Sequence, residues 1–283
     1  TALKLVEPFD LGKGPDAALQ PQAMHLIAEA EKLAYADRDK YIGDPDFVDV
    51  PVDEMLDSAY LESRANEIDA SYSMGKAEPG RLADERAMNW GMNQPVDMPS
   101  TSHFSILDSN GNVVSMTTSV EGPFGSPLMA GGMMLNNQLT DFSFAPEQDG
   151  KPVANAVAPG KRPRSSMTPV IVFDEDGAFR AAVGSPGGSR IIGYVTQTLI
   201  ALIDWDMDMV AAVGLPRFLD RNGPLEIEAG TPLEQMTPQL EELGHRVEAR
   251  PAISGLHGIL VMPDGLDGAA DPRRDGNVVT GQP

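Results

Sequence analysis

The sequence of 283 residues contains no cysteine. Disulfides, thiolate nucleophiles and cysteine metal sites are therefore excluded. No apolar run approaches the ~20 residues that a membrane helix needs, so we expect no membrane span in this chain. The four histidines, His25, His103, His245 and His257, are scattered, with no pair at metal-ligand spacing. We therefore expect neither a catalytic metal nor a cofactor.

Basic residues are also scarce. Lys and Arg total 21 against 42 Asp and Glu, which gives a net charge of −21. Binding to nucleic acid requires a basic surface, so we expect no nucleic-acid partner. The acidity favours solubility, including in salt. Hydrophobic residues make up 41% of the chain, which is ordinary for a globular protein long enough to bury a core.

Helical and extended patterns alternate along the chain, which excludes an all-α or all-β fold. The predicted helices cover 21–41, 52–68 and 189–204, and the predicted strands cover 168–173, 178–183, 225–228 and 258–262. In the first helix, apolar residues lie on one side and charged residues on the other. Residues 72–100 show no clear period, and we expect them to form an irregular surface segment.

A β-hairpin is predicted around residues 108–111 (Asp-Ser-Asn-Gly), which separate two stretches rich in β-branched and apolar residues. A three-residue loop with Gly111 in the left-handed conformation pairs Thr101 with Ser119. A two-residue loop instead pairs Thr101 with Val120 and turns Ser119 to the opposite face. The sequence leaves this register open.

Four motifs carry the functional signal. They are Thr-Ser-His-Phe-Ser at 101–105, Leu-Asn-Asn-Gln-Leu-Thr-Asp-Phe-Ser at 135–143, Arg-Pro-Arg-Ser-Ser-Met-Thr-Pro at 162–169, and Gly-Ser-Pro-Gly-Gly-Ser-Arg at 184–190. In order and approximate spacing they resemble motifs of the gamma-glutamyltranspeptidase family, whose precursors cleave themselves before the first threonine. The resemblance implies an α+β fold, the four-layer αββα sandwich of N-terminal-nucleophile hydrolases.

The resemblance also divides the chain. Residues 1–100 resemble the last part of the family's large (alpha) subunit, and 101–283 resemble its small (beta) subunit, both within one interlaced domain. No secretory signal pattern opens the chain, and we expect the upstream part of the large subunit to be missing from it. That remainder is an expected partner, and the family implies a periplasmic or secreted location. Thr1 is rejected as a nucleophile because its surroundings match nothing in the family.

The predicted catalytic centre is built on Thr101. A threonine hydroxyl is a weak nucleophile unless a base stands beside it, and a cut before the threonine frees its own α-amine for that role. The resemblance places the cut at Ser100-Thr101 and assigns a supporting hydroxyl to Ser119. Gly187 and Gly188 match the oxyanion hole, and glycines between a strand and a helix let backbone N–H groups face a developing negative charge.

The resemblance also implies the substrate contacts. Gln138 and Asp141 match residues that contact the glutamyl α-amino group. Ser165 and Ser166 match a pair that hydrogen-bonds the α-carboxylate, while the arginine that clamps this carboxylate belongs to the upstream region. Residues 145–160 are either an ordinary loop or a lid over the substrate.

Glu121 departs from the family pattern. Asparagine holds the glutamyl amino group at this position in the transpeptidases, and a regular strand would place Glu121 on the same face as Ser119. The carboxylate either grips the ammonium more tightly or marks a different substrate. The implied function is a gamma-glutamyltransferase or hydrolase acting on amides such as glutathione, with an amine or water as acceptor. The alternatives are a same-family amidase, such as a glutaryl-cephalosporin acylase, and a paralogue that never matures and only binds small carboxylates.

Overall fold

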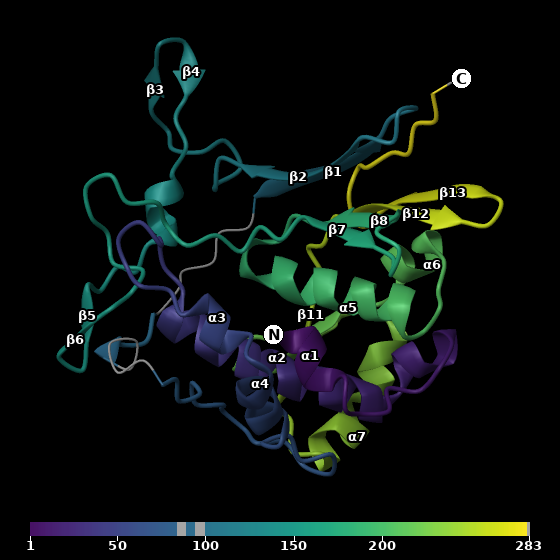
Figure 1. Cartoon of the computed structure of the whole chain (residues 1–283), viewed down its shortest axis with the longest axis horizontal. Coiled ribbons are helices and arrows are strands. Elements are labelled where there is room, and N and C mark those ends of the chain that lie inside the picture. Colours follow the sequence, from purple (N-terminus) through teal and green to yellow (C-terminus); the bar gives the residue numbers. More distant parts are fainter. Residues whose placement is uncertain (84–88, 94–99, 282–283) are drawn as a thin grey trace.

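The computed structural model describes residues 1–83, 89–93 and 100–281 (Figure 1). Its helices are α1 (Ala2–Val6), α2 (Pro21–Tyr41), α3 (Val52–Met55), α4 (Ser58–Ala65), α5 (Ile191–Ile203), α6 (Met209–Gly214) and α7 (Thr237–Glu242). Its strands are β1 (Thr101–Leu107), β2 (Val113–Ser119), β3 (Met129–Ala130), β4 (Met133–Met134), β5 (Glu147–Gln148), β6 (Lys151–Pro152), β7 (Val170–Phe173), β8 (Phe179–Gly184), β9 (Phe218–Asp220), β10 (Leu225–Glu228), β11 (Val247–Arg250), β12 (His257–Met262) and β13 (Gly265–Ala270).

The layers follow from the central antiparallel sheet, whose strand order is β13-β12-β8-β7. The β1–β2 hairpin packs on one face of this sheet, and α5 and α6 pack on the other (Figure 1). Below them lie α1, α2 and α4 from the first hundred residues, beside the small β11-β10-β9 sheet. Two β layers with helices beneath them confirm the predicted α+β class.

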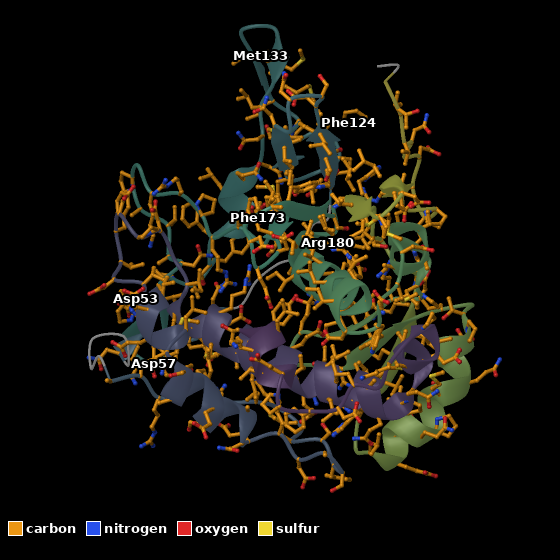
Figure 2. All side chains as sticks on the ribbon, turned by 45° about the vertical axis from the view of Figure 1, so that its right-hand side comes forward. Asp53, Asp57, Phe124, Met133, Phe173 and Arg180 are labelled. Atoms are coloured by element: carbon orange, nitrogen blue, oxygen red, sulfur yellow. The ribbon has the colours of Figure 1, made fainter. Side chains whose placement is uncertain are left out.

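The outer face of the β1–β2 hairpin is apolar and uncovered by the described residues. Phe104, Ile106, Val114 and Met116 are 39–51% exposed there. A second helix layer would pack on this face in a complete αββα sandwich. The β3–β4 hairpin is a further exposed apolar element: Figure 2 shows it projecting from the body with Met133 at its tip.

One buried core joins the first hundred residues to the later part of the chain. Leu5, Met24 and Leu33 share it with Trp205 and Phe218. The predicted charged side of α2 does not face solvent, which corrects the sequence-based picture: this helix is also buried at Glu29, Glu31, Lys32 and Asp37. Elements far along the chain cover that side, so the local pattern could not reveal its burial.

Two predicted helices have different bounds. The stretch 52–68 forms α3 and α4, because Asp57 accepts hydrogen bonds from the backbone N–H groups of Ala59 and Tyr60 (2.9 and 3.2 Å) and so starts a new helix. The stretch 189–204 begins as a 3-10 turn before α5. The four predicted strands correspond to β7, β8, β10 and β12.

The segment 72–100 is only partly as predicted. Its described residues belong to none of the named helices and strands, but Ser73, Ala77 and Asn93 are buried rather than on the surface. Residues 84–88 and 94–99 of this segment lie outside the described part. None of the described helices is both long enough and apolar enough to span a bilayer.

Candidate active site

The predicted site residues come together in one pocket. All of the predicted catalytic and substrate-binding residues line it except Gly187, and several residues without a predicted role join them. The lining consists of Arg38, Thr101, Ser119, Glu121, Gln138, Asp141, Arg164, Ser165, Ser166, Met167, Gly188, Ser189 and Ile191. Thr1 is not among them.

The hairpin has the register that requires a three-residue loop. Thr101 pairs with Ser119 across β1 and β2. A hydrogen bond from the Asp108 N–H to the Asn112 carbonyl (3.0 Å) closes the loop of the hairpin. Within the loop, Gly111 has a φ of +83°. Of the two loops that the sequence left open, the three-residue loop with a left-handed glycine is the one formed, and the pairing of Thr101 with Val120 is excluded.

The Ser119 hydroxyl links the predicted nucleophile to the predicted scissile bond. Its Oγ accepts from Thr101 Oγ1 at 3.3 Å and from the Glu121 N–H at 2.9 Å, and it donates to the Ser100 carbonyl at 2.9 Å. The Thr101–Ser119 separation is slightly longer than the 2.6–3.2 Å typical of a catalytic hydrogen bond. This network orients the Thr101 hydroxyl and polarises the carbonyl that self-cleavage would attack.

Arg274 holds the main chain of Thr101 from the C-terminal segment. Its Nη1 donates to the Thr101 carbonyl at 3.2 Å and its Nη2 to the Ile253 carbonyl at 2.8 Å. Because 173 positions separate Arg274 from Thr101, no local pattern in the sequence could have indicated this contact.

Glu121 reaches the pocket by a different path from the predicted one. Strand β2 ends at Ser119, and Glu121 has a φ of +74° instead of continuing the strand. A left-handed conformation costs a residue other than glycine or asparagine about 1–2 kcal/mol. The carboxylate at this position therefore comes with backbone strain, which asparagine would relieve in part.

Gln138 and Asp141 lie on the 3-10 helix Gln138–Asp141. The Asp141 carbonyl accepts from Asn155 Nδ2 at 2.7 Å, and Asn155 Oδ1 accepts from the Arg164 N–H at 2.8 Å. Asn155 thus ties the turn that carries the acid to the loop that carries the serine pair. Gln138 Oε1 is buried without a partner among the described residues, so it is available to accept from a ligand.

The loop that carries the serine pair is anchored to the first hundred residues by two arginines. Arg162 Nη2 lies 2.6 Å from Asp44 Oδ1, and this hydrogen-bonded pair holds the pKa of Asp44 well below its usual range. Arg164 Nη2 lies 2.9 Å from Asp39 Oδ1, and its Nη1 donates to the Arg38 carbonyl at 2.8 Å. These contacts give the arginines of the third motif a structural role.

The glycine pair forms the turn between β8 and α5. Gly187 has a φ of +142° and Gly188 a φ of +61°. A Cβ atom on Gly187 would lie 2.9 Å from Tyr194 Cε2, so both the backbone conformation and the packing require glycine there. Gly188 lines the pocket close to the N-terminal end of α5, where the helix dipole favours negative charge.

The family follows from comparison with known proteins. The model of the family described as gamma-glutamyltranspeptidase matches residues 1–281. The chain belongs to the gamma-glutamyltranspeptidase family.

Two curated proteins and one solved structure are examples of what this chain is similar to. The chain is 40% identical over 295 residues to a glutathione hydrolase proenzyme of Escherichia coli (strain K12), covering 99% of this chain and 48% of the relative. It is 35% identical to the Acylase ACY 1 proenzyme of Pseudomonas sp. (strain V22), covering 98% and 46%. The crystal structure of a cephalosporin acylase from Bacillus halodurans matches with a TM-score of 0.81 at 26% identity, covering 100% of this chain and 48% of that one. The chain thus spans about half the length of these relatives.

Some pocket residues were not given a role from sequence, although most lie within the segments that resemble the family. Arg164, Met167 and Ser189 belong to the third and fourth motifs, and Arg38 lies in the first hundred residues, which resemble the large subunit. The signal for these residues was present as a family resemblance, but nothing in the sequence showed that their side chains meet at the pocket.

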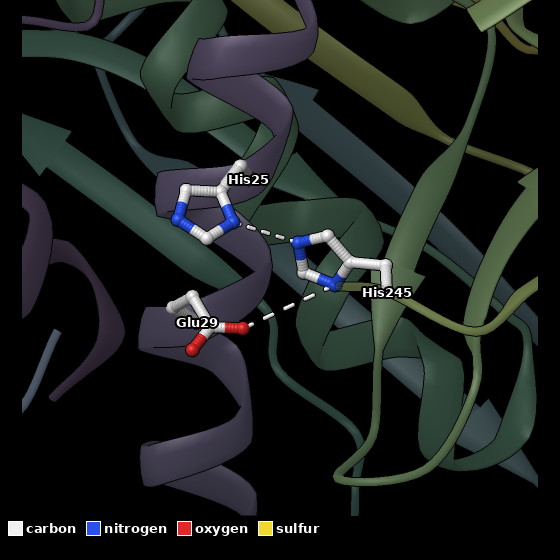
Figure 3. Close-up of side chains that lie close together, drawn as sticks. All are labelled: His25, Glu29 and His245. Carbon is white, nitrogen blue, oxygen red and sulfur yellow. Dashed lines mark hydrogen bonds and ion pairs between the residues drawn. The ribbon is translucent and has the colours of Figure 1, made fainter. Parts of the chain in front are cut away.

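Two histidines that are far apart in sequence form a buried group with Glu29 (Figure 3). His25 Nε2 lies 2.8 Å from the Asp69 carbonyl, and His25 Nδ1 lies 2.8 Å from His245 Nε2. Since a carbonyl can only accept, His25 Nε2 carries a proton and donates it to the Asp69 carbonyl. Burial lowers the pKa of His245 to about 4. The histidines that look scattered in the sequence are therefore partly clustered in space.

The geometry of this group does not suit a metal ion. The two ring nitrogens of His245 point to different partners, one to His25 and the other toward Glu29 Oε1 at 4.0 Å (Figure 3). Glu29 Oε1 already accepts from Lys32 Nζ at 2.7 Å and Ser73 Oγ at 2.8 Å. The ammonium of Lys32 would repel a cation, so we assign no metal to the group.

Proposed function

We propose that this chain carries the nucleophile and much of the acyl-donor site of a gamma-glutamyltransferase/hydrolase that cleaves gamma-glutamyl amides such as glutathione. The main support is the hydroxyl network at the 100–101 peptide bond, where Ser119 contacts both the Thr101 hydroxyl and the Ser100 carbonyl. In this proposal residues 1–100 and 101–283 become parts of two subunits, and the remainder of the large subunit is a partner.

Self-cleavage comes first in the proposed sequence. Thr101 Oγ1 attacks the carbonyl carbon of Ser100, the C–N bond breaks, and the hydroxyl proton passes to the nitrogen, which leaves an ester. Water then hydrolyses the ester to a Ser100 carboxylate and a Thr101 with a free α-amine and hydroxyl. The hydrogen bond from Ser119 to the Ser100 carbonyl stabilises the oxyanion that forms during the attack.

Acyl transfer then uses the same hydroxyl. The α-amine of Thr101 takes the proton from Oγ1 as the oxygen attacks the γ-acyl carbon, and it returns the proton to the departing amine. An acceptor amine or water releases the acyl group from the enzyme. Gly188, close to the N-terminal end of α5, is in position to stabilise the oxyanion of each step.

The charges of the pocket support a zwitterionic donor. Glu121 and Asp141 bring carboxylates to the lining, and the unpartnered Gln138 Oε1 adds an acceptor, which together suit an ammonium group. Ser165 and Ser166 bring hydroxyl donors, which suit a carboxylate. A gamma-glutamyl group carries both of these charged groups on one carbon.

A glutaryl acylase is the second candidate. It is supported by the similarity to the Acylase ACY 1 proenzyme and by the presence of Glu121 where the transpeptidases have asparagine. A glutaryl group has the carboxylate but lacks the ammonium, so donor preference distinguishes the two enzymes. A paralogue that never matures is the third candidate, and it would remain uncut.

Replacing Glu121 with alanine in the full-length protein tests the ammonium site. Loss of a hydrogen bond to a charged group should raise the KM for gamma-glutamyl anilide by about 10- to 100-fold. The KM for glutaryl anilide should change little, because that donor has no amine. Steady-state kinetics with the two anilides measure the difference.

Two further variants serve as controls for this prediction. Glu121→Asn suits the positive φ and keeps an acceptor, so it should retain most of the activity on gamma-glutamyl anilide. Glu175→Ala removes an exposed carboxylate from the turn between β7 and β8 and should change neither KM. Equal losses on both donors in Glu121→Ala would contradict the proposal that Glu121 binds the donor's ammonium group.

A further inference from the structure

Arg38, near the C-terminal end of α2, reaches the pocket from the first hundred residues. Its side chain is 13% exposed and lines the same pocket as Thr101. Its Nη2 donates to Ser166 Oγ at 2.6 Å. Arg38 is therefore in direct contact with one of the two serines proposed to face the donor's carboxylate.

The direction of this hydrogen bond determines what Ser166 can do. An arginine only donates, so Ser166 Oγ accepts from Arg38 and its single hydrogen points away from the guanidinium. A hydroxyl that accepts from a cation is polarised and becomes a better donor. Arg38 thus orients the Ser166 hydroxyl so that an acceptor in the pocket can receive its hydrogen.

Arg38 shares its neighbouring acid with a second arginine. Asp39 Oδ1 lies 3.3 Å from Arg38 Nη1 and 2.9 Å from Arg164 Nη2, so two guanidinium groups share one carboxylate. Burial lowers the pKa of Arg164 to about 9, and the positive charge of Arg38 contributes to that shift. Asp39 and Asp141 act in the opposite direction on Arg164, so two arginines and two acids lie close to the serine pair.

We propose that Arg38 is a positioning residue that orients the Ser166 hydroxyl toward the carboxylate on the donor's acyl group. This inference rests on the proposed function, because it assumes that the serine pair faces the donor. It adds a residue of the first hundred to the donor site, across the proposed cleavage point.

Three anilide donors separate this role from a structural one. Gamma-glutamyl anilide has both the ammonium and the carboxylate, glutaryl anilide has only the carboxylate, and 4-aminobutanoyl anilide has only the ammonium. Arg38→Met in the full-length protein should raise the KM for the first two by about 10- to 100-fold. The third should change less than about 2-fold, since it lacks the carboxylate toward which Arg38 orients Ser166, and kcat should change little for all three.

A double-mutant cycle tests the action through Ser166. Ser166→Ala should show the same donor selectivity, and adding Arg38→Met to it should cost less than the product of the two single losses. Arg38→Lys keeps the charge but loses the planar fork, so it should show a smaller loss with the same selectivity. Arg246→Met removes an arginine whose side chain is 75% exposed and that does not line the pocket, and it should behave as wild type.

The possible outcomes are distinct. Equal losses on all three donors, or no loss on any, would overturn the role of Arg38. If Arg38→Met does not mature, the donor profile of Arg38→Lys decides, and an unselective loss again overturns the inference. A wild type that matures but does not turn over gamma-glutamyl anilide contradicts the proposed function, not the role of Arg38. In that case, a loss in Arg38→Met on glutaryl anilide but not on 4-aminobutanoyl anilide would still support the positioning role of Arg38.

Discussion

Thr101→Ala in the full-length protein should give a single uncut chain whose activity on gamma-glutamyl anilide is lower by at least about 10⁴-fold, the scale of losses when a nucleophile is removed. Alanine has no hydroxyl to attack the Ser100 carbonyl, so no free α-amine forms. The alanine also provides no atom to hold the acyl group. A denaturing gel and an anilide assay measure the two effects on one sample.

Two variants control this result. Thr101→Ser keeps the hydroxyl and should still cut, more slowly or to a lesser extent. Ser102→Ala removes a neighbouring hydroxyl that is exposed and points to the opposite face of β1, so it should cut as wild type does. If the full-length wild type stays uncut and yet turns over gamma-glutamyl substrates, Thr101 is not an N-terminal nucleophile.

Lys32→Met should destabilise the protein by about 3–5 kcal/mol at pH 7.5, the usual cost of removing one partner of a buried ion pair. Lys32 is 2% exposed, and its Nζ lies 2.7 Å from Glu29 Oε1 and 3.6 Å from Asp220 Oδ2. Methionine fills a similar volume but leaves both buried carboxylates without their cation. Urea unfolding of the full-length protein measures the loss.

The loss of stability in Lys32→Met should become smaller at low pH. Burial raises the pKa of Asp220 from its usual 3.8 to about 6, while the charge of Lys32 holds it down. Because this folded-state pKa is raised, the contribution of Asp220 to stability is present below about pH 4 and is lost as the pH rises through about 6. Removing Lys32 raises the pKa further, so the variant regains stability when Asp220 takes up a proton.

Unfolding at pH 5.0 and 7.5 tests this sign. The difference between wild type and Lys32→Met should be smaller at pH 5.0. Lys76→Met, at an exposed position, should stay within about 0.5 kcal/mol of wild type at both values. A loss for Lys32→Met that grows toward pH 5.0, or one below about 1 kcal/mol at pH 7.5, contradicts the assigned buried ion pair.

Local chemistry was enough to predict the hairpin that carries the nucleophile, but it left two registers open. The turn residues Asp108 to Asn112 allow few loop geometries, and the three-residue option alone gives the observed pairing of Thr101 with Ser119. The strands β7 and β8 and the helix α5 could likewise be predicted, because the spacing of apolar residues within each short segment indicates its secondary structure.

Contacts between distant segments could not be predicted. His25 and His245 are 220 positions apart, and Arg38 and Ser166 are 128 positions apart. A single sequence does not encode such proximity in any local pattern. The left-handed conformation of Glu121 was also missed, because a glutamate at the end of a strand gives no signal for it.

The core shared by Leu5, Met24 and Leu33 with Trp205 and Phe218 determines what happens to the two pieces after a cut at Ser100. If the chain is cut as proposed, neither piece can leave without exposing that core to water, and the nicked protein would be an obligate heterodimer in which dissociation and unfolding are one event. Its thermal midpoint then rises with protein concentration, whereas the midpoint of uncut Thr101→Ala does not. Self-cleavage would thus change the molecularity of unfolding while adding only one water molecule to the native protein.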